Sequence, residues 1–154
     1  MLKKIFSLIT ALLILSSCGY TPMFSKNFEN DYIIKIKDFK GDNDLNNFIR
    51  QKINRVIDND KNDVKIFEIS FVTSYSKEIQ TKDKSSKVKQ YSLIANANFT
   101  IENNGTVEKV VFNEKSIMSK LSDDFEESNY EKSFKDNLSQ IFVNKLTRFL
   151  SRIK

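Results

Sequence analysis

The chain has 154 residues, 25 of them Lys or Arg and 20 Asp or Glu, with a formal charge of +5, no His and one Cys. Without His, and with a single thiol, it lacks the usual groups for acid–base catalysis at neutral pH and for zinc binding. We therefore predict a protein that is not an enzyme and binds no metal or diffusible cofactor. The charge excess is too small to indicate nucleic-acid binding.

The N-terminus has the pattern of a bacterial lipoprotein signal. Lys3 and Lys4 precede an apolar run over residues 5–15, which is too short for a spanning helix of about 20 residues. The run ends in Leu15-Ser16-Ser17-Cys18, a lipobox. We predict that residues 1–17 are cleaved and that Cys18 is the lipid attachment site, with S-diacylglycerol and an N-acyl chain. The alternatives are an ordinary secretory signal with an incidental Cys, and an uncleaved anchor.

Residues 18–31 contain the only Pro and no sustained periodicity, so we expect an acylated tether ahead of a single domain over residues 32–154. Residues 32–37 are β-rich and predict a first strand. Residues 41–44 then supply turn and N-cap side chains. A helical stripe follows at three- and four-residue intervals, formed by Leu45, Phe48, Ile49, Ile53, Val56 and Ile57.

Three further strands are predicted after the polar run at residues 58–62. In residues 64–75, the odd-numbered positions from Phe67 to Tyr75 share one face. In residues 88–102, apolar and polar side chains alternate, which is typical of a strand with one buried face. Asn104-Gly105 predicts a tight hairpin, because both residues tolerate positive φ angles. It leads into a strand over residues 106–118.

A second helix is predicted from a cap at residues 122–124 to the end of the chain. Its apolar stripe comprises Phe134, Leu138, Ile141, Phe142, Leu146, Phe149, Leu150 and Ile153. The predicted order is therefore β-α-β-β-β-α. This order indicates an α+β fold, a two-layer sandwich with two helices packed on one face of a four-stranded mixed sheet.

Residues 76–89 carry five lysines against two acidic residues and are almost without apolar side chains. We expect a mobile loop or hairpin tip that projects into solvent. Its lysines are candidates for contact with phosphorylated lipid or an acidic partner, because ammonium groups on flexible stems suit diffuse anionic targets. The candidates are Lys82, Lys84, Lys87 and Lys89. The alternative is a solvated loop in a lysine-rich protein.

Cys18-Gly19-Tyr20-Thr21-Pro22-Met23-Phe24 resembles the mature N-terminus of the LptE family of lipopolysaccharide-assembly lipoproteins, in its alphaproteobacterial form. The start of the last helix, at residues 123–132, is also similar to that family, and so are the order of elements and the length of the chain.

This resemblance implies a lipid-anchored protein in the periplasmic leaflet of the outer membrane. Its partners would be an LptD-like β-barrel and lipopolysaccharide, and it would act as plug and assembly factor in lipopolysaccharide transport to the cell surface. No fixed motif aligns the lysines of residues 76–89 with the family. Two other functions remain open: a periplasmic lipoprotein adaptor that regulates an envelope (cell-wall) enzyme, and a soluble lipid carrier.

Overall fold

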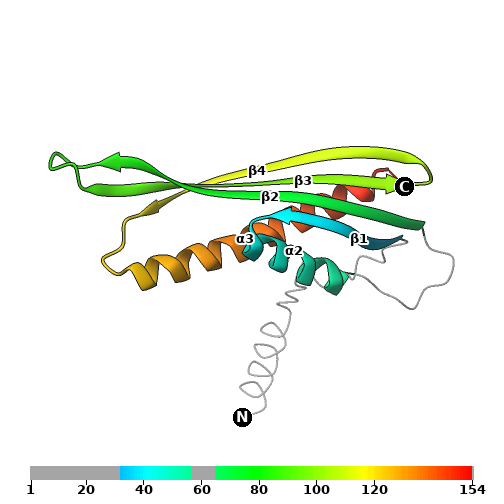
Figure 1. Ribbon diagram of the computed structural model, residues 1–154, viewed down its shortest axis with the longest axis horizontal. Coiled ribbons are helices and arrows are strands. Elements are labelled where there is room, and N and C mark those ends of the chain that lie inside the picture. The colour runs from blue at the N-terminus through cyan, green and yellow to red at the C-terminus, as the bar shows by residue number, and fades with distance from the viewer. Residues whose placement is uncertain (1–31, 57–64, 154) are drawn as a thin grey trace, which may run out of the picture.

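The computed structural model describes residues 32–56 and 65–153, and the predicted Cys18 site lies outside them. The order of elements is the predicted β-α-β-β-β-α (Figure 1). The elements are β1 (Tyr32–Gly41), α2 (Asn43–Val56), β2 (Lys65–Lys82), β3 (Val88–Asn103), β4 (Thr106–Ser119) and α3 (Asp124–Leu150). In this part of the chain no helix is long and apolar enough to cross a membrane.

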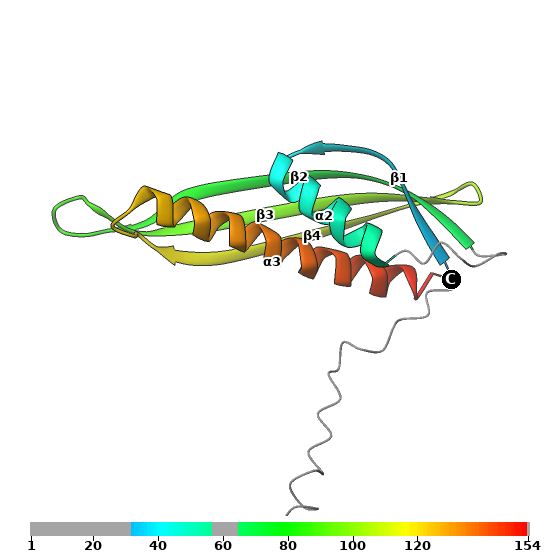
Figure 2. The same cartoon turned by 90° about the horizontal axis from the view of Figure 1, so that it is seen from below.

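The four strands form one mixed sheet in the order β1-β2-β3-β4. β1 runs parallel to β2, which requires the crossover through α2, and the other two pairings are antiparallel. Both helices lie on the same face of the sheet and pack side by side (Figure 2). The predicted fold class, a two-layer α+β sandwich, is therefore confirmed.

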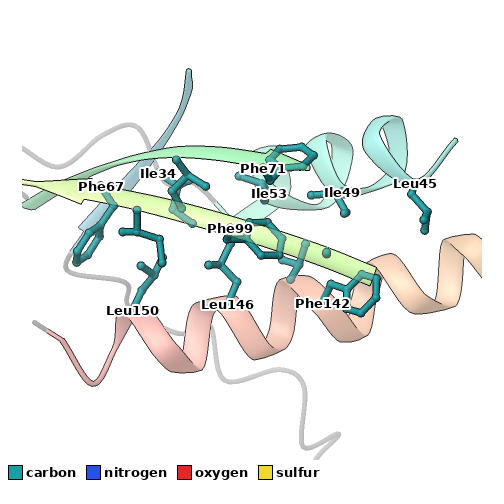
Figure 3. Packing of buried hydrophobic residues seen from close by; sticks show 14 of the residues in the cluster. Ile34, Leu45, Ile49, Ile53, Phe67, Phe71, Phe99, Phe142, Leu146 and Leu150 are labelled. Atoms are coloured by element: carbon teal, nitrogen blue, oxygen red, sulfur yellow. The ribbon is translucent and has the colours of Figure 1, made fainter. Parts of the chain in front are cut away.

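The core lies between the sheet and the helices. Phe67, Phe71 and Phe99 come from the strands, Phe142 and Leu146 come from α3, and all five side chains are buried between the two layers (Figure 3). Five rings contact one another in a chain across the whole sheet and onto α3, with centroid distances of 5.8, 5.5, 5.8 and 6.5 Å; they are Phe39, Phe71, Phe99, Phe112 and Phe142. Such pairs add about 0.5–1.5 kcal/mol each beyond the apolar area that they bury.

The local signals at the ends of the elements have the predicted roles. Asp42 Oδ1 accepts a hydrogen bond from the Leu45 amide at 2.9 Å, and Asp123 caps α3 by accepting from the Phe125 amide at 2.8 Å. Asn104 and Gly105 have φ values of 47° and 81° between the paired residues Asn103 and Thr106. This is the two-residue turn that the Asn-Gly sequence predicts.

The predicted end of β2 at Tyr75 was wrong. β2 continues to Lys82 and β3 begins at Val88, so only residues 83–87 lie outside the strands. The region at residues 76–89 is therefore a hairpin tip rather than a long loop. The segment after Tyr75 has a weak apolar pattern of its own, but Lys77 pairs with Leu93 and Ile79 with Tyr91. Pairing with an apolar partner strand extends β2 beyond the range that its own sequence indicates.

The predicted stripe of α3 needs two corrections. The helix ends at Leu150 and does not reach the end of the chain, so Ile153 lies beyond it. Ile141 was expected to be buried, but it is 39% exposed, whereas Val143 is fully buried. The helix is 27 residues long, and its buried side is set by the sheet and by α2 together. The spacing of apolar residues alone does not specify which side of a long helix is covered by the sheet and which by another helix.

Gly41 provides a test of the β1–β2 junction. Its φ is +108°, and a Cβ atom there would lie 1.8 Å from the Thr73 carbonyl oxygen. We expect Gly41→Ala to lower the free energy of unfolding by about 3 kcal/mol or more, because both the backbone conformation and the close strand contact are lost. Urea denaturation of the unacylated domain measures this.

Gly105→Ala is the matched control. Gly105 also has positive φ, at +81°, but no atom lies within 4 Å of the added Cβ. We expect Gly105→Ala to lower the free energy of unfolding by only about 1–2 kcal/mol, which is the strain of a left-handed backbone conformation in a residue with a Cβ atom. Equal losses in the two variants would contradict the steric argument.

Candidate functional site

The four candidate lysines come together in a projecting turn, here termed the lysine hairpin (residues 82–89). Ser119, the last residue of β4, pairs with Gln90, and the Lys120 amide bonds to the Lys89 carbonyl at 2.8 Å. Beyond that contact no other strand of the described residues lies beside β2 and β3. Figures 1 and 2 both show the hairpin extending past the end of β4 and the start of α3.

The turn of the lysine hairpin is organised by Asp83. Its Oδ1 accepts hydrogen bonds from the Ser85 and Lys87 amides at 2.8 and 2.9 Å. Its backbone N–H bonds to the Lys87 carbonyl at 2.8 Å, and its carbonyl accepts from the Ser86 amide at 3.0 Å, with Ser86 at φ 61°. The only carboxylate of the hairpin is thus engaged by backbone donors, which leaves the lysine side chains to solvent.

All four lysines of the hairpin are exposed. Within residues 32–56 and 65–153, no carboxylate lies within ion-pair distance of their ammonium groups. Four unpaired cations therefore surround one aspartate on a narrow two-stranded tip. Flexible ammonium groups of this kind can contact several phosphate or carboxylate groups without a fixed geometry.

Lys77, which the sequence grouped with these lysines, has a different environment. Its Nζ lies 2.8 Å from Glu127 Oε2 and 2.7 Å from Glu131 Oε1, and 4.2 Å from the centre of the Tyr91 ring. Lys120 Nζ approaches Glu127 Oε1 at 3.1 Å. We call Lys77, Lys120, Glu127 and Glu131 the ionic seam, because they join the first turns of α3 to the distal half of the sheet.

A second group of contacts continues the ionic seam toward α2. The Tyr75 hydroxyl donates to Glu131 Oε2 at 2.9 Å. Lys135 Nζ lies 2.8 Å from Asp42 Oδ2, 3.2 Å from Asp44 Oδ2 and 4.5 Å from the centre of the Tyr75 ring. α3 is thereby tied to the N-cap of α2 as well as to β2.

Glu127 is the most deeply buried carboxyl group of the ionic seam, with a side-chain exposure of 6%. Burial by itself would raise its pKa. Hydrogen bonds from the Lys77 ammonium, the Leu121 amide and the Lys120 ammonium outweigh that cost and lower the pKa of Glu127 from 4.5 to about 2. Burial and the bond to Glu131 raise the pKa of Tyr75, so its phenol stays protonated and donates.

The ionic seam was not predicted from the sequence, although the spacing of residues in α3 contains a signal for it. Glu127 and Glu131 precede Phe134 and Leu138 on the same face of the helix, at intervals of four, three and four residues. The apolar stripe begins only at Phe134, while the helix begins at Asp124. Acidic residues that extend an apolar stripe indicate that the facing strand supplies cations.

No family model matches the sequence, and no curated protein matches it either. Its structure is similar to the crystal structure of rare lipoprotein B from Shewanella oneidensis, with a TM-score of 0.57, 12% identity, and coverage of 78% of this chain and 97% of that chain. Bacterial lipoproteins adopt this fold.

A solution structure of an uncharacterized lipoprotein B from Nitrosomonas europaea is also similar. Its TM-score is 0.51 at 12% identity, and the match covers 79% of this chain and 88% of that chain. At such identities the likeness concerns the fold alone.

Glu127→Gln tests the ionic seam. We expect this variant to lose about 2–3 kcal/mol of unfolding free energy at pH 7, because the partly exposed ammonium groups of Lys77 and Lys120 lose the charge of a buried carboxylate. The pKa of Glu127 is lower in the folded state than in the unfolded chain, so its stabilisation is present above pH 4.5 and is lost as the pH falls toward about 2. The difference between wild type and variant should shrink over that range in urea unfolding curves.

Glu126→Gln is the control for the same helix turn, since Glu126 is exposed. It should change the unfolding free energy by less than about 0.5 kcal/mol at any pH. A Glu127→Gln effect that is independent of pH, or matched by Glu126→Gln, would count against an ionic role.

Proposed function

We propose that this chain is an outer-membrane lipoprotein that acts with an LptD-like β-barrel, as plug and assembly factor, in lipopolysaccharide transport to the cell surface. The observation that carries the proposal is the combination of a fold that bacterial lipoproteins adopt with the lipobox and the Cys18–Phe24 sequence that precede it. Acyl chains on Cys18, at about 0.8 kcal/mol per buried methylene, would hold the domain at the membrane surface.

The shape of the domain is compatible with this role. The sheet is long and narrow, its helices cover one face, and the lysine hairpin extends from one end (Figure 1). A plug needs a rigid body and surface contacts rather than a catalytic centre. The space between sheet and helices is filled by buried aromatic and aliphatic side chains such as Phe67, Phe99 and Phe142, which argues against a lipid carrier with a cavity between the layers.

The lysine hairpin would then contact the phosphate groups of lipopolysaccharide. Its four ammonium groups have no internal countercharge in the described residues, whereas the cations of the ionic seam are already neutralised. An anionic ligand gains most from cations that it does not have to separate from a protein carboxylate. The hairpin therefore suits this ligand better than Lys77, Lys120 or Lys135.

The partnership is tested with the acylated full chain. Purification from detergent-solubilised outer membrane should recover a β-barrel of much larger mass, and depletion should reduce both the folded barrel and surface lipopolysaccharide. Recovery of an inner-membrane enzyme, with lipopolysaccharide export unchanged, would instead support the adaptor of an envelope enzyme. Depletion that leaves barrel assembly and surface lipopolysaccharide intact would refute the proposal.

The lysine hairpin is tested separately. Replacement of Lys82, Lys84, Lys87 and Lys89 by Gln should weaken binding to purified lipopolysaccharide by about tenfold or more, since a lysine near an anionic surface contributes about 1 kcal/mol. The loss should diminish as salt is raised. Surface-immobilised lipopolysaccharide and purified variants allow the measurement.

The matched control removes four exposed cations elsewhere, by Gln substitution of Lys35, Lys40, Lys132 and Arg152. The two variants have the same net charge. Equal affinity of the two for lipopolysaccharide would show that total charge, not the hairpin, determines binding.

A further inference from the structure

The two edges of the sheet differ in how they are protected. β1 has a register shift between Ile36 and Asp38 and carries Lys35, Lys37 and Lys40, features that discourage pairing with another strand. β4 pairs with β3 without interruption from Thr106↔Asn103 to Ser119↔Gln90. Among the described residues nothing pairs with its other side. A long regular edge of this kind is a template for an added strand.

The backbone groups of β4 that are free to pair can be assigned from the turn. In a two-residue hairpin the residues that flank the turn, here Asn103 and Thr106, are hydrogen-bonded to each other. Donor direction alternates along a strand. The N–H and C=O groups of the odd-numbered residues from Val107 to Ile117 therefore point away from β3.

The side chains of these same residues lie on the sheet face opposite the helices. Val107, Val111 and Ile117 are 56%, 66% and 54% exposed. Lys109 and Lys115 lie between them, are exposed, and have no carboxylate partner among the described residues. The free edge thus presents β-branched side chains alternating with two unpaired cations.

The helix side of the same edge is also incompletely covered. Lys145 of α3 forms an ion pair with Glu114 of β4 and lies 5.8 Å from the centre of the Phe112 ring. Ile141 precedes Lys145 by four residues, so it lies on the same flank of α3, beside β4. An added strand would cover Ile141, the one predicted stripe residue that the domain leaves exposed.

A second copy of this chain fits the edge poorly. In an antiparallel pair, opposite residues share a face, so two registers give the greatest overlap of β4 with itself. One places Lys109 opposite Lys115, and like charges directly opposite are destabilising. The other places the two lysines opposite Ile117 and Val111. Charge complementarity favours a different sequence.

We propose that β4 pairs through its free edge with an extended strand of a partner protein, whose carboxylates, six residues apart on one face, lie opposite Lys109 and Lys115. Main-chain hydrogen bonds would supply affinity, and apolar residues opposite Val107, Val111 and Ile117 would supply specificity. This inference depends only on the geometry of β4 and does not rest on the proposed function.

The test uses the full acylated chain in cells that produce it naturally, with a photo-crosslinking residue in place of Val111 or Ile117. Val72 is the matched control, because it is 49% exposed on the same face but lies on β2, away from the edge. We expect one partner to crosslink from both β4 positions and not from Val72. The crosslinked peptide should contain carboxylates six residues apart.

Two variants then test whether the crosslinked partner pairs with β4 as a strand. Val111→Pro removes one outward N–H while the bonds to β3 remain, and should abolish the crosslink from Ile117; Val111→Ala should retain it. Lys109→Glu with Lys115→Glu should also abolish it, and this pair keeps the test decisive if the Pro variant fails to fold. Both lysine side chains are exposed, so circular dichroism should remain unchanged.

Four results would overturn the proposal. They are a crosslink between two copies of this chain, an equal crosslink from Val72, a β4 crosslink that survives both the Pro and the double Glu variants, and the absence of any crosslink from β4. Failure to recover a barrel in the depletion and purification experiments would refute the proposed function but not this proposal, because any protein that supplies such an acidic strand satisfies it.

Discussion

Residues of β2 and β3 pair from Glu68↔Glu102 to Lys82↔Val88, and this antiparallel ladder runs the length of the sheet. Every other element is positioned against it. β1 adds to one side through the α2 crossover, β4 adds to the other through a two-residue turn, and α3 lies along the inner face. Because the ladder is longer than its neighbours, its last residues necessarily project as the lysine hairpin.

The inner face of this ladder is covered in two chemically different ways. Near Phe71 and Phe99 the contact with the helices is apolar, and burial of those side chains drives folding. Near Lys77 the contact is the ionic seam, which gains less free energy because burying charges costs desolvation. The ionic seam instead fixes the position of α3 on the strands, since each of its ammonium groups forms ion pairs with particular carboxylates of the helix.

The same division separates the lysines by function. Lys77, Lys120 and Lys135 hold the helix layer in place, and their charges are already neutralised by carboxylates of the domain. The lysines of the hairpin and of β4 are exposed and unpaired among the described residues, so they remain available to anionic groups of other molecules. Under the two proposals, one end of the sheet would contact lipopolysaccharide and one edge would pair with a protein partner.

The sequence by itself determined the local structure and the fold class. The caps at Asp42 and Asp123, the Asn104-Gly105 turn and the alternation in β3 depend on residues close together in the chain, so their patterns predicted the order of elements and the two-layer fold. Only the tertiary structure decided how far β2 extends, where Lys77 lies and why Ile141 is exposed. Those features depend on which strand or helix lies opposite, and a residue's own neighbours in sequence carry no record of that partner.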